Sequence, residues 1–297
     1  MLVYRVAFGL QRQCYIVTTA SETKDYGNKY TATKLKHLLK QADYTTEEYS
    51  LDGYFDYTPE KWAVPRAKKA LERLLSEVDT LEYILYLTSS DKSNFRFKKA
   101  TTCGPNGQGY KEGRGAKPHY YQLIREYYEQ DPNCEVVYGM EADDAMAMHQ
   151  HNNTDTIICT QDKDLRMVPG EHYNFVDKIF FTVENPGSVY IGKTSGGNDK
   201  ITGTGICWFY AQMLLGDKDD NIPKIPFYGA VKVEKLLRGI TQESEMIDIV
   251  WKIYYNKFKD KAKDRFLEVA DLLWMLRNEG EFKSVFLEKH LKEVYNV

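Results

Sequence analysis

Short apolar runs alternate with helix-forming stretches through the middle of the chain. Residues 83–87, 135–138 and 156–159 are apolar runs of strand length, and they predict buried strands. Between them, residues 118–130 carry apolar side chains at helical spacing, and residues 143–150 are rich in alanine and methionine. Strands that alternate with helices predict an α/β fold with a central, mainly parallel sheet flanked by helices.

The second half of the chain changes its pattern. Residues 175–193 predict an antiparallel hairpin with its turn at Asn185-Pro186-Gly187. From Trp208 onward the pattern is mostly helical, with amphipathic stretches at residues 243–259 and 263–278. We therefore expect a helical C-terminal region after the α/β core.

Residues 20–64 form a polar, tyrosine-rich segment in which only residues 34–41 predict a helix. No role follows from this segment. The five cysteines include no CxxC pair, so we expect reduced thiols and neither a disulfide framework nor a zinc site. No apolar run approaches the roughly 20 residues of a membrane span, and the N-terminus lacks the layout of a signal peptide. These features predict a cytoplasmic protein that does not associate with membranes.

Charge is unevenly placed along the chain. The formal net charge is −3, whereas a purely electrostatic DNA binder is usually basic. Residues 92–117 nevertheless hold seven basic side chains and only one acid, Glu112. The basic residues are Lys92, Arg96, Lys98, Lys99, Lys111, Arg114 and Lys117. This stretch is suited to binding phosphate groups.

Carboxylates gather at three places, each at the end of a predicted element. The three groups are Glu141, Asp143 and Asp144, then Asp162 and Asp164, and finally Asp217 and Asp220. Each group alone has an ordinary explanation, as a helix N-terminus, an Asx turn or a helix end. Together they indicate one site, because ligand sites in such sheets gather at the carboxyl ends of the strands. Oxygen ligands without cysteine or histidine favour Mg²⁺ or Mn²⁺, and a metal pair suits hydrolysis at phosphorus.

In this order the motifs resemble those of the 5′-nuclease superfamily, most closely the phage-encoded 5′–3′ exonucleases and flap endonucleases. The matching motifs are Glu141-x-Asp143-Asp144, Asp162-x-Asp164 and Gly216-Asp217-x-x-Asp220-Asn221-Ile222-Pro223. The resemblance covers roughly residues 83–238. It implies one nuclease domain over residues 1–297. Its parts would be a metal-binding core at 83–200 with a basic arch region at 92–117, a helix–three-turn–helix element at 201–240, and C-terminal helices at 241–297.

The resemblance also implies an activity and its residues. The expected reaction is metal-dependent hydrolysis of DNA from a 5′ end or flap by two Mg²⁺ ions, which Mn²⁺ can replace, leaving a 5′-phosphate. The implied metal ligands are Asp91, Glu141, Asp143, Asp144, Asp162, Asp164, Asp217 and Asp220. Lys111 and Arg96 are expected to contact the scissile phosphate. The expected DNA-binding residues are Lys98, Tyr110, Arg114, Lys224, Gly229 and Lys232, with Tyr110 stacking on an unpaired base.

Further implications concern partners and context. The helix–three-turn–helix element of the family often holds K⁺. RNA–DNA hybrids are compatible substrates, and we expect a monomer. A phage-encoded enzyme would act in the host cytoplasm, where primer removal and host DNA degradation are natural roles.

Two departures keep alternatives open. The family carries an aspartate on its first strand, a few residues before a segment like Leu2-Val3-Tyr4-Arg5, and this chain begins at Met1. The family's glycine-rich turn reads Pro226-Phe227-Tyr228-Gly229, with a single glycine. One alternative is a DNA-binding protein of the same fold with impaired catalysis. Another is a related metal-dependent ribonuclease, against which the duplex-gripping segment 216–237 argues.

Overall fold

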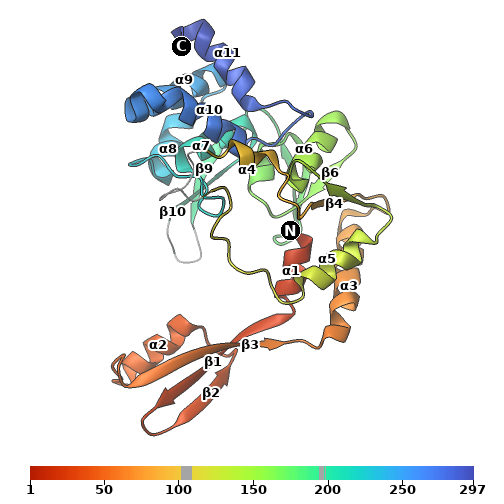
Figure 1. Ribbon diagram of the computed structural model, residues 1–297, viewed down its shortest axis with the longest axis vertical. Coiled ribbons are helices and arrows are strands. Elements are labelled where there is room, and N and C mark those ends of the chain that lie inside the picture. The colour runs from red at the N-terminus through yellow and green to blue at the C-terminus, as the bar shows by residue number, and fades with distance from the viewer. Residues whose placement is uncertain (102–108, 194–196, 198) are drawn as a thin grey trace. The chain divides into compact units, whose positions relative to one another are not determined.

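The computed structural model describes residues 1–101, 109–193, 197 and 199–297. Part of the basic stretch at 92–117, together with Cys103, lies outside the described residues. The fold is a mixed α/β fold (Figure 1). The chain forms two compact units, residues 1–83 with 116–132 and residues 84–115 with 133–297.

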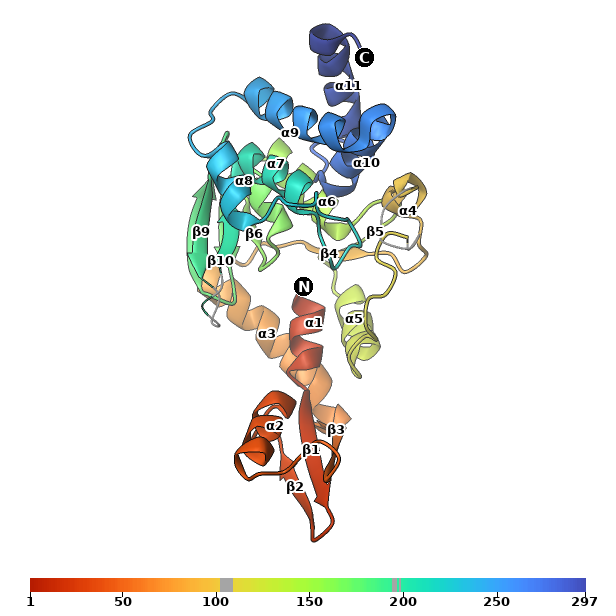
Figure 2. The same ribbon diagram turned by 90° about the vertical axis from the view of Figure 1, so that its left-hand side faces the viewer.

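The first unit contains a small antiparallel sheet with one helix. Strand β1 (Gln11–Thr19) lies between β2 (Thr23–Gly27) and β3 (Tyr49–Tyr57). Helix α2 (Ala32–Gln41) connects β2 to β3, which confirms the helix predicted at 34–41. Its apolar side chains Leu35 and Leu39 form a small core with Val17 of β1. Figure 2 shows this strand–helix arrangement.

Three further helices complete the first unit: α1 (Leu2–Phe8), α3 (Ala63–Val78) and α5 (Tyr121–Glu129), which contact one another. A short 3-10 turn, Glu60–Trp62, precedes α3. The resemblance had placed residues 2–5 at the end of a strand. They form the helix α1 instead, because Val3 and Val6 lie on one helical face and are both buried.

The second unit contains short strands paired in parallel. Strand β4 (Leu85–Thr88) pairs with β5 (Cys134–Val137), and β6 (Ile157–Cys159) pairs with β7 (Gly170–Asn174). Strand β8 (Ile179–Val183) then adds to β7 in the antiparallel sense. Parallel pairs therefore occur, but the described strands form separate sheets instead of the single central sheet that we expected. Apolar runs indicate where strands lie and do not determine which strands pair.

The hairpin expected over residues 175–193 is wrong. Strand β8 pairs with β7, whereas β9 (Val189–Lys193) pairs with β10 (Asp199–Gly203). The chain does turn at Gly187, whose φ is +71°, but this turn packs against the start of the helix at Gly205–Leu215. A Cβ atom at Gly187 would lie 2.0 Å from the carbonyl oxygen of Thr204. This packing carries the chain between two sheets.

Helices form the rest of the second unit. After α4 (Phe95–Lys99) and α6 (Ala142–Asn152), they are α7 (Gly205–Leu215), α8 (Ala230–Leu237), α9 (Glu243–Phe258), α10 (Ala262–Leu273) and α11 (Lys283–Tyr295), with 3-10 turns at Asp164–Met167 and Lys259–Lys261. The buried α7 contacts α8, α9 and α10 and forms the centre of the main core. The predicted C-terminal helices are confirmed as α9 and α10, although α10 ends at Leu273. No described helix has the length and apolar character that crossing a membrane requires.

Candidate active site

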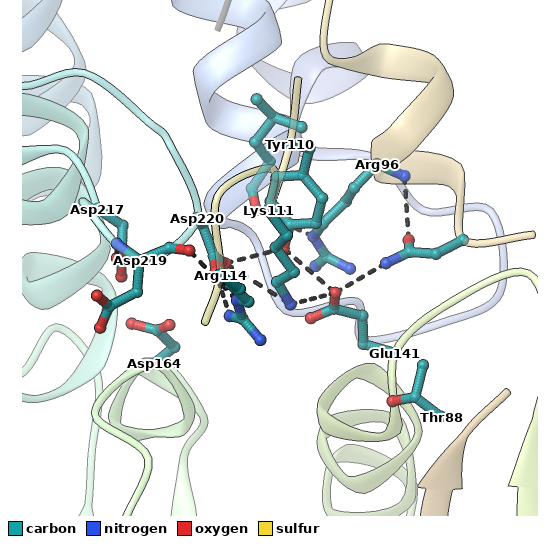
Figure 3. Close-up of polar contacts among 12 residues, drawn as sticks. Thr88, Arg96, Tyr110, Lys111, Arg114, Glu141, Asp164, Asp217, Asp219 and Asp220 are labelled. Carbon is teal, nitrogen blue, oxygen red and sulfur yellow. Dashed lines mark hydrogen bonds and ion pairs between the residues drawn. The ribbon is translucent and has the colours of Figure 1, made fainter. Parts of the chain in front are cut away.

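The second unit brings the three acidic groups together. Glu141 caps α6 and Asp143 lies in its first turn, while Asp162 and Asp164 follow β6. The negative charges of Asp162 and Glu141 raise the pKa of Asp143, and those of Asp162 and Asp217 raise the pKa of Asp164. Figure 3 shows Asp164 pointing towards the loop that carries Asp217, Asp219 and Asp220. Six carboxylates from three sequence motifs thus form one acidic cluster: Glu141, Asp143, Asp162, Asp164, Asp217 and Asp220.

The pKa values of this acidic cluster reflect crowding of like charges. Burial, followed by repulsion from Asp162, raises the pKa of Asp143 and of Asp164 to about 7. Burial also raises the pKa of Asp220, although Lys111 acts in the opposite direction. For Glu141, burial opposes ionisation, but the charges of Lys111 and Arg96 outweigh it and lower the pKa. Ionising these carboxyl groups together at neutral pH is therefore costly, and cations placed beside them lower that cost.

Three basic side chains supply part of this compensation. Lys111 forms an ion pair with Glu141, and the Nζ of Lys111 lies 3.7 Å from Oδ2 of Asp220. The other carboxylate oxygen of Asp220 pairs with Arg114. The Nζ of Lys163 lies 2.5 Å from Oδ2 of Asp217 and 3.6 Å from Oδ1 of Asp164. Across the described parts of the chain, no three acidic, histidine or cysteine side chains are close enough to form a ready-made metal site. A metal ion would therefore compete with these basic groups for the carboxylates.

Backbone geometry holds the loop that carries Asp217 and Asp220. Asp217 and Ile222 exchange backbone hydrogen bonds of 2.8 and 2.7 Å, which close the loop. Gly216 adopts φ +65°, and a Cβ atom there would lie 2.4 Å from the carbonyl oxygen of Ile222. Only glycine fits this close approach of two backbone segments. The glycine of the third motif therefore shapes the loop that presents the two aspartates.

Helix α7 holds the second acidic group in place. The indole N–H of Trp208 donates to the carbonyl oxygen of Lys163 at 2.9 Å, and one turn later the amide of Gln212 donates to Oδ1 of Asp164. Gln212 is buried, and its Oε1 has no hydrogen-bond partner among the described residues. Sequence reasoning missed Gln212 and Lys163. The available signal was a single strongly polar side chain in an otherwise apolar helix directly before the third motif.

Arg96 and Asp144 form a buried ion pair that the sequence did not predict. Arg96 is fully buried and donates to both carboxylate oxygens of Asp144 at 2.5 and 2.9 Å. It also donates to the carbonyl oxygens of Leu272 and Trp274 at 2.9 and 2.6 Å. Burial opposes the charge of Arg96, but Asp144 outweighs it and raises the arginine's pKa. With its donors occupied away from solvent, Arg96 is not placed to contact a scissile phosphate.

Asp144 is equally committed to the protein interior. Its carboxylate also accepts hydrogen bonds from the backbone N–H groups of Glu141 and Leu276, at 3.0 and 3.1 Å. These contacts complete a capping box at the start of α6 and connect it to the segment after α10. They leave Asp144 poorly suited to the metal-ligand role that we expected.

Tyr110 is also placed differently from our expectation. It is buried, and its hydroxyl donates to Asp220 at 2.9 Å and to Glu141 at 3.3 Å. This burial is incompatible with stacking on a base, and the side chain instead connects two carboxylates of the acidic cluster. Asp91 is exposed, and its Oδ1 accepts a hydrogen bond from the backbone N–H of Ser93 at 3.0 Å. Lys98 is exposed on α4.

The remaining expected DNA-binding residues follow α7. Residues 216–229 connect α7 to α8, with Lys224 and Lys232 both exposed. The Nζ of Lys232 lies 3.9 Å from the ring centre of Tyr228. Gly229 precedes α8 with an ordinary φ of −93°. The helix–three-turn–helix assignment and its K⁺ site stay predictions.

Comparisons with known proteins give a structural likeness. No family model and no curated protein matches the chain. The zinc-bound T5 5′-exonuclease has a TM-score of 0.47 and 13% identity over 79% of this chain and 90% of that one. A mutant of the T5 5′-exonuclease has a TM-score of 0.45 and 12% identity over 79% of this chain and 92% of that one. The third structure is the bacteriophage T5 flap endonuclease as a pseudo-enzyme–product complex with DNA and metal ions. It has a TM-score of 0.45 and 12% identity over 78% of this chain and 90% of that one. The chain is thus similar in structure to T5 5′-exonuclease and flap endonuclease, at low sequence identity.

Proposed function

We propose that this protein is a metal-dependent nuclease that hydrolyses DNA at or near a 5′ end or flap. The observation that supports the proposal is the acidic cluster itself, with Lys111 and Arg114 on its border. Carboxylates from three separate motifs meet there, in the order in which the 5′-nuclease superfamily carries them. Three unrelated solvent-exposed loops would have no reason to bring their charges together against mutual repulsion.

The donor chemistry of the acidic cluster suits hard divalent cations. All its donors are oxygens, which favours Mg²⁺ and Mn²⁺. Asp143, Asp162, Asp164 and Asp217 would hold the ions, with Glu141 and Asp220 at the edge beside Lys111. Bound ions of this kind lower the pKa of a water molecule and stabilise the leaving oxygen of a phosphodiester.

Basic side chains would serve the substrate. Lys111 and Arg114 contact Glu141 and Asp220, and Arg114 is exposed. When divalent cations neutralise the carboxylates, these two side chains are free to bind the oxygens of the scissile phosphate. Such contacts stabilise the charge that develops during hydrolysis. Contacts to phosphate instead of base edges make cleavage insensitive to sequence.

The test is cleavage of a 5′-labelled flap duplex and a blunt duplex in Mg²⁺, with EDTA as the metal-free control. Asp162→Ala removes a central carboxylate, and we expect it to lower the rate by roughly 10²–10³-fold. Asp260→Ala removes an exposed acid in the turn before α10 and serves as the matched control. Cleavage that persists in EDTA, or an unchanged rate in Asp162→Ala, would contradict the proposal.

A second candidate function is DNA binding without catalysis. The observation in its favour is that Lys111, Arg114 and Lys163 already neutralise part of the acidic cluster. The same substrates separate the two functions when binding is followed by fluorescence anisotropy. Tight binding of the flap without cleavage in either Mg²⁺ or Mn²⁺ would favour the second candidate.

A further inference from the structure

Phe227 combines two unusual features in the loop between α7 and α8. Its side chain is 90% exposed, and its backbone has φ +68°. Nine described non-glycine residues have positive φ, and the other eight are lysine, aspartate or asparagine. Phe227 is the one apolar residue among them.

Both features are unfavourable for the isolated protein. A positive φ brings the Cβ atom close to the backbone, and for a bulky residue this conformation is a true outlier. Burial of the ring cannot compensate, because the ring lies almost entirely in water. A strained conformation that presents an apolar ring to solvent points to a contact with a partner.

The surroundings of Phe227 identify the chemistry of that partner. The loop segment from Lys224 to Lys232 contains no acidic residue, and both lysines are exposed. Tyr228 lies beneath the ammonium group of Lys232, and Val231 adds exposed apolar surface beside them. Aromatic rings flanked by lysines match a nucleic acid, in which flat bases and sugars alternate with phosphates.

We propose that Phe227 packs against a nucleotide of the DNA substrate while Lys224 and Lys232 bind the neighbouring phosphates. The inference rests on the proposed function for its choice of DNA over other polyanions. It extends that function by assigning an aromatic contact to a turn that the family resemblance fills with glycine. Phe227 thereby adds a stacking or wedge contact to a surface that lysines alone would hold through phosphates.

The decisive variant is Phe227→Gly, because its effects on folding and on binding have opposite signs. Glycine adopts positive φ without strain, so we expect the melting temperature to stay the same or rise by about 2–4 °C. Loss of the ring should weaken binding of a 5′-flap duplex about 10-fold, since base–aromatic stacking contributes on that order. Binding is measured by anisotropy in Ca²⁺ with the Asp162→Ala background, so that cleavage does not interfere.

Three further variants complete the experiment. Phe227→Tyr keeps the ring and should bind DNA as the parent protein does. Leu81→Ala removes an apolar side chain that is 91% exposed in the first unit, and it should change neither quantity. Lys224→Ala should weaken binding and reduce its dependence on salt.

The outcomes separate this inference from the proposed function. Unchanged DNA affinity in Phe227→Gly overturns the aromatic contact, and a loss confined to Lys224→Ala means that phosphates alone are bound. A parent protein that binds no DNA overturns both proposals. If the parent protein binds DNA through Phe227 but does not cleave it, the proposed aromatic contact stands and the proposed nuclease activity is wrong.

Discussion

The ion pair between Arg96 and Asp144 is the most deeply buried charge pair of the acidic region. Both side chains have an exposed fraction of 0%. We expect Arg96→Met to lower the free energy of unfolding by about 3–5 kcal/mol, because it leaves a buried carboxylate without its partner. Urea unfolding at pH 7 measures this change. Arg73→Met is the matched control, since its pair with Glu77 is at the surface and contributes less than about 1 kcal/mol.

The opposite result at Arg96 would be informative. A variant that unfolds like the parent protein but no longer cleaves DNA would return Arg96 to the phosphate-binding role expected from the sequence. We propose that role for Lys111 and Arg114 instead, because their side chains border the acidic cluster and reach solvent.

Gln212 positions a carboxylate of the acidic cluster from within the core. We expect Gln212→Met to weaken Mn²⁺ binding by roughly 10-fold, because the residues that orient metal ligands typically contribute on this scale. Isothermal titration calorimetry with Mn²⁺ measures the affinity without requiring cleavage. The variant also removes the unpaired amide oxygen, so its stability should change little.

Tyr254→Phe provides the control for Gln212. It removes a hydrogen bond of 2.7 Å from the Tyr254 hydroxyl on α9 to the carbonyl oxygen of Met213. Met213 follows Gln212 directly on α7. Its Mn²⁺ affinity should equal that of the parent protein. If both variants lose the same affinity, Gln212 acts only through the packing of α7.

At the residue scale, the sequence predicted the acids but not all of the side chains that hold them in place. Asp162 and Asp164 could be found because a DxD spacing after an apolar strand is a local pattern. Gln212 contacts Asp164 across 48 positions of sequence, and Arg96 contacts Asp144 across the same separation. Local patterns carry no information about such contacts, so the sequence did not predict that Arg96 is buried against Asp144.

The loop after α7 is the element on which the third acidic group depends. We expect Gly216→Ala to destabilise the protein by about 1–3 kcal/mol, because Gly216 combines positive φ with a Cβ position 2.4 Å from a carbonyl oxygen. The distorted loop should also move Asp217 and Asp220 and weaken Mn²⁺ binding. Thermal unfolding and calorimetry measure the two effects.

Gly229→Ala is the matched control in the same loop. Gly229 has an ordinary φ of −93°, and a Cβ atom there meets nothing within 4 Å. Its stability should stay within about 0.5 kcal/mol of the parent protein. Equal losses at both glycines would mean that the loop geometry around Gly216 is not needed to hold the acids.

At the element scale, the position of an element was easier to predict than its pairing. The periodicity of α9 and α10 marked them as helices, and the short apolar runs marked β4, β5 and β6. The partners of β8 and β9 depend on tertiary packing, such as the approach of Gly187 to Thr204. A turn signal between two strands is compatible with a hairpin and also with strands that belong to different sheets.

The stability of the second unit should depend on pH in a direction set by the acidic cluster. The pKa values of Asp143 and Asp164 are raised in the folded state, from 3.8 to about 7. Between about pH 4 and 7 the folded metal-free protein therefore binds more protons than the unfolded chain. Stability falls with rising pH wherever the folded state binds the extra protons. The pKa of Glu141 is lowered, which opposes this trend but concerns a lower pH range.

We therefore expect the metal-free second unit to lose about 3–5 kcal/mol of stability between pH 5 and pH 8. Saturating Mg²⁺ should reverse the trend, because the ions bind the ionised carboxylates and stabilise the folded state most at high pH. Urea unfolding followed by tryptophan fluorescence measures both curves. A Trp62→Phe background confines the signal to the second unit, which holds Trp208, Trp251 and Trp274.

Replacing the two aspartates with asparagine tests the origin of the effect. The double variant Asp143→Asn, Asp164→Asn cannot ionise at these positions, so it should lose much less metal-free stability between pH 5 and pH 8 than the parent protein and should respond weakly to Mg²⁺. A parent protein that becomes more stable on going from pH 5 to pH 8 in EDTA would mean that Lys111, Arg114 and Lys163 compensate the carboxylates fully. The acidic cluster would then have no charge left for metal ions to neutralise, and the electrostatic argument that it binds two metal ions would fail.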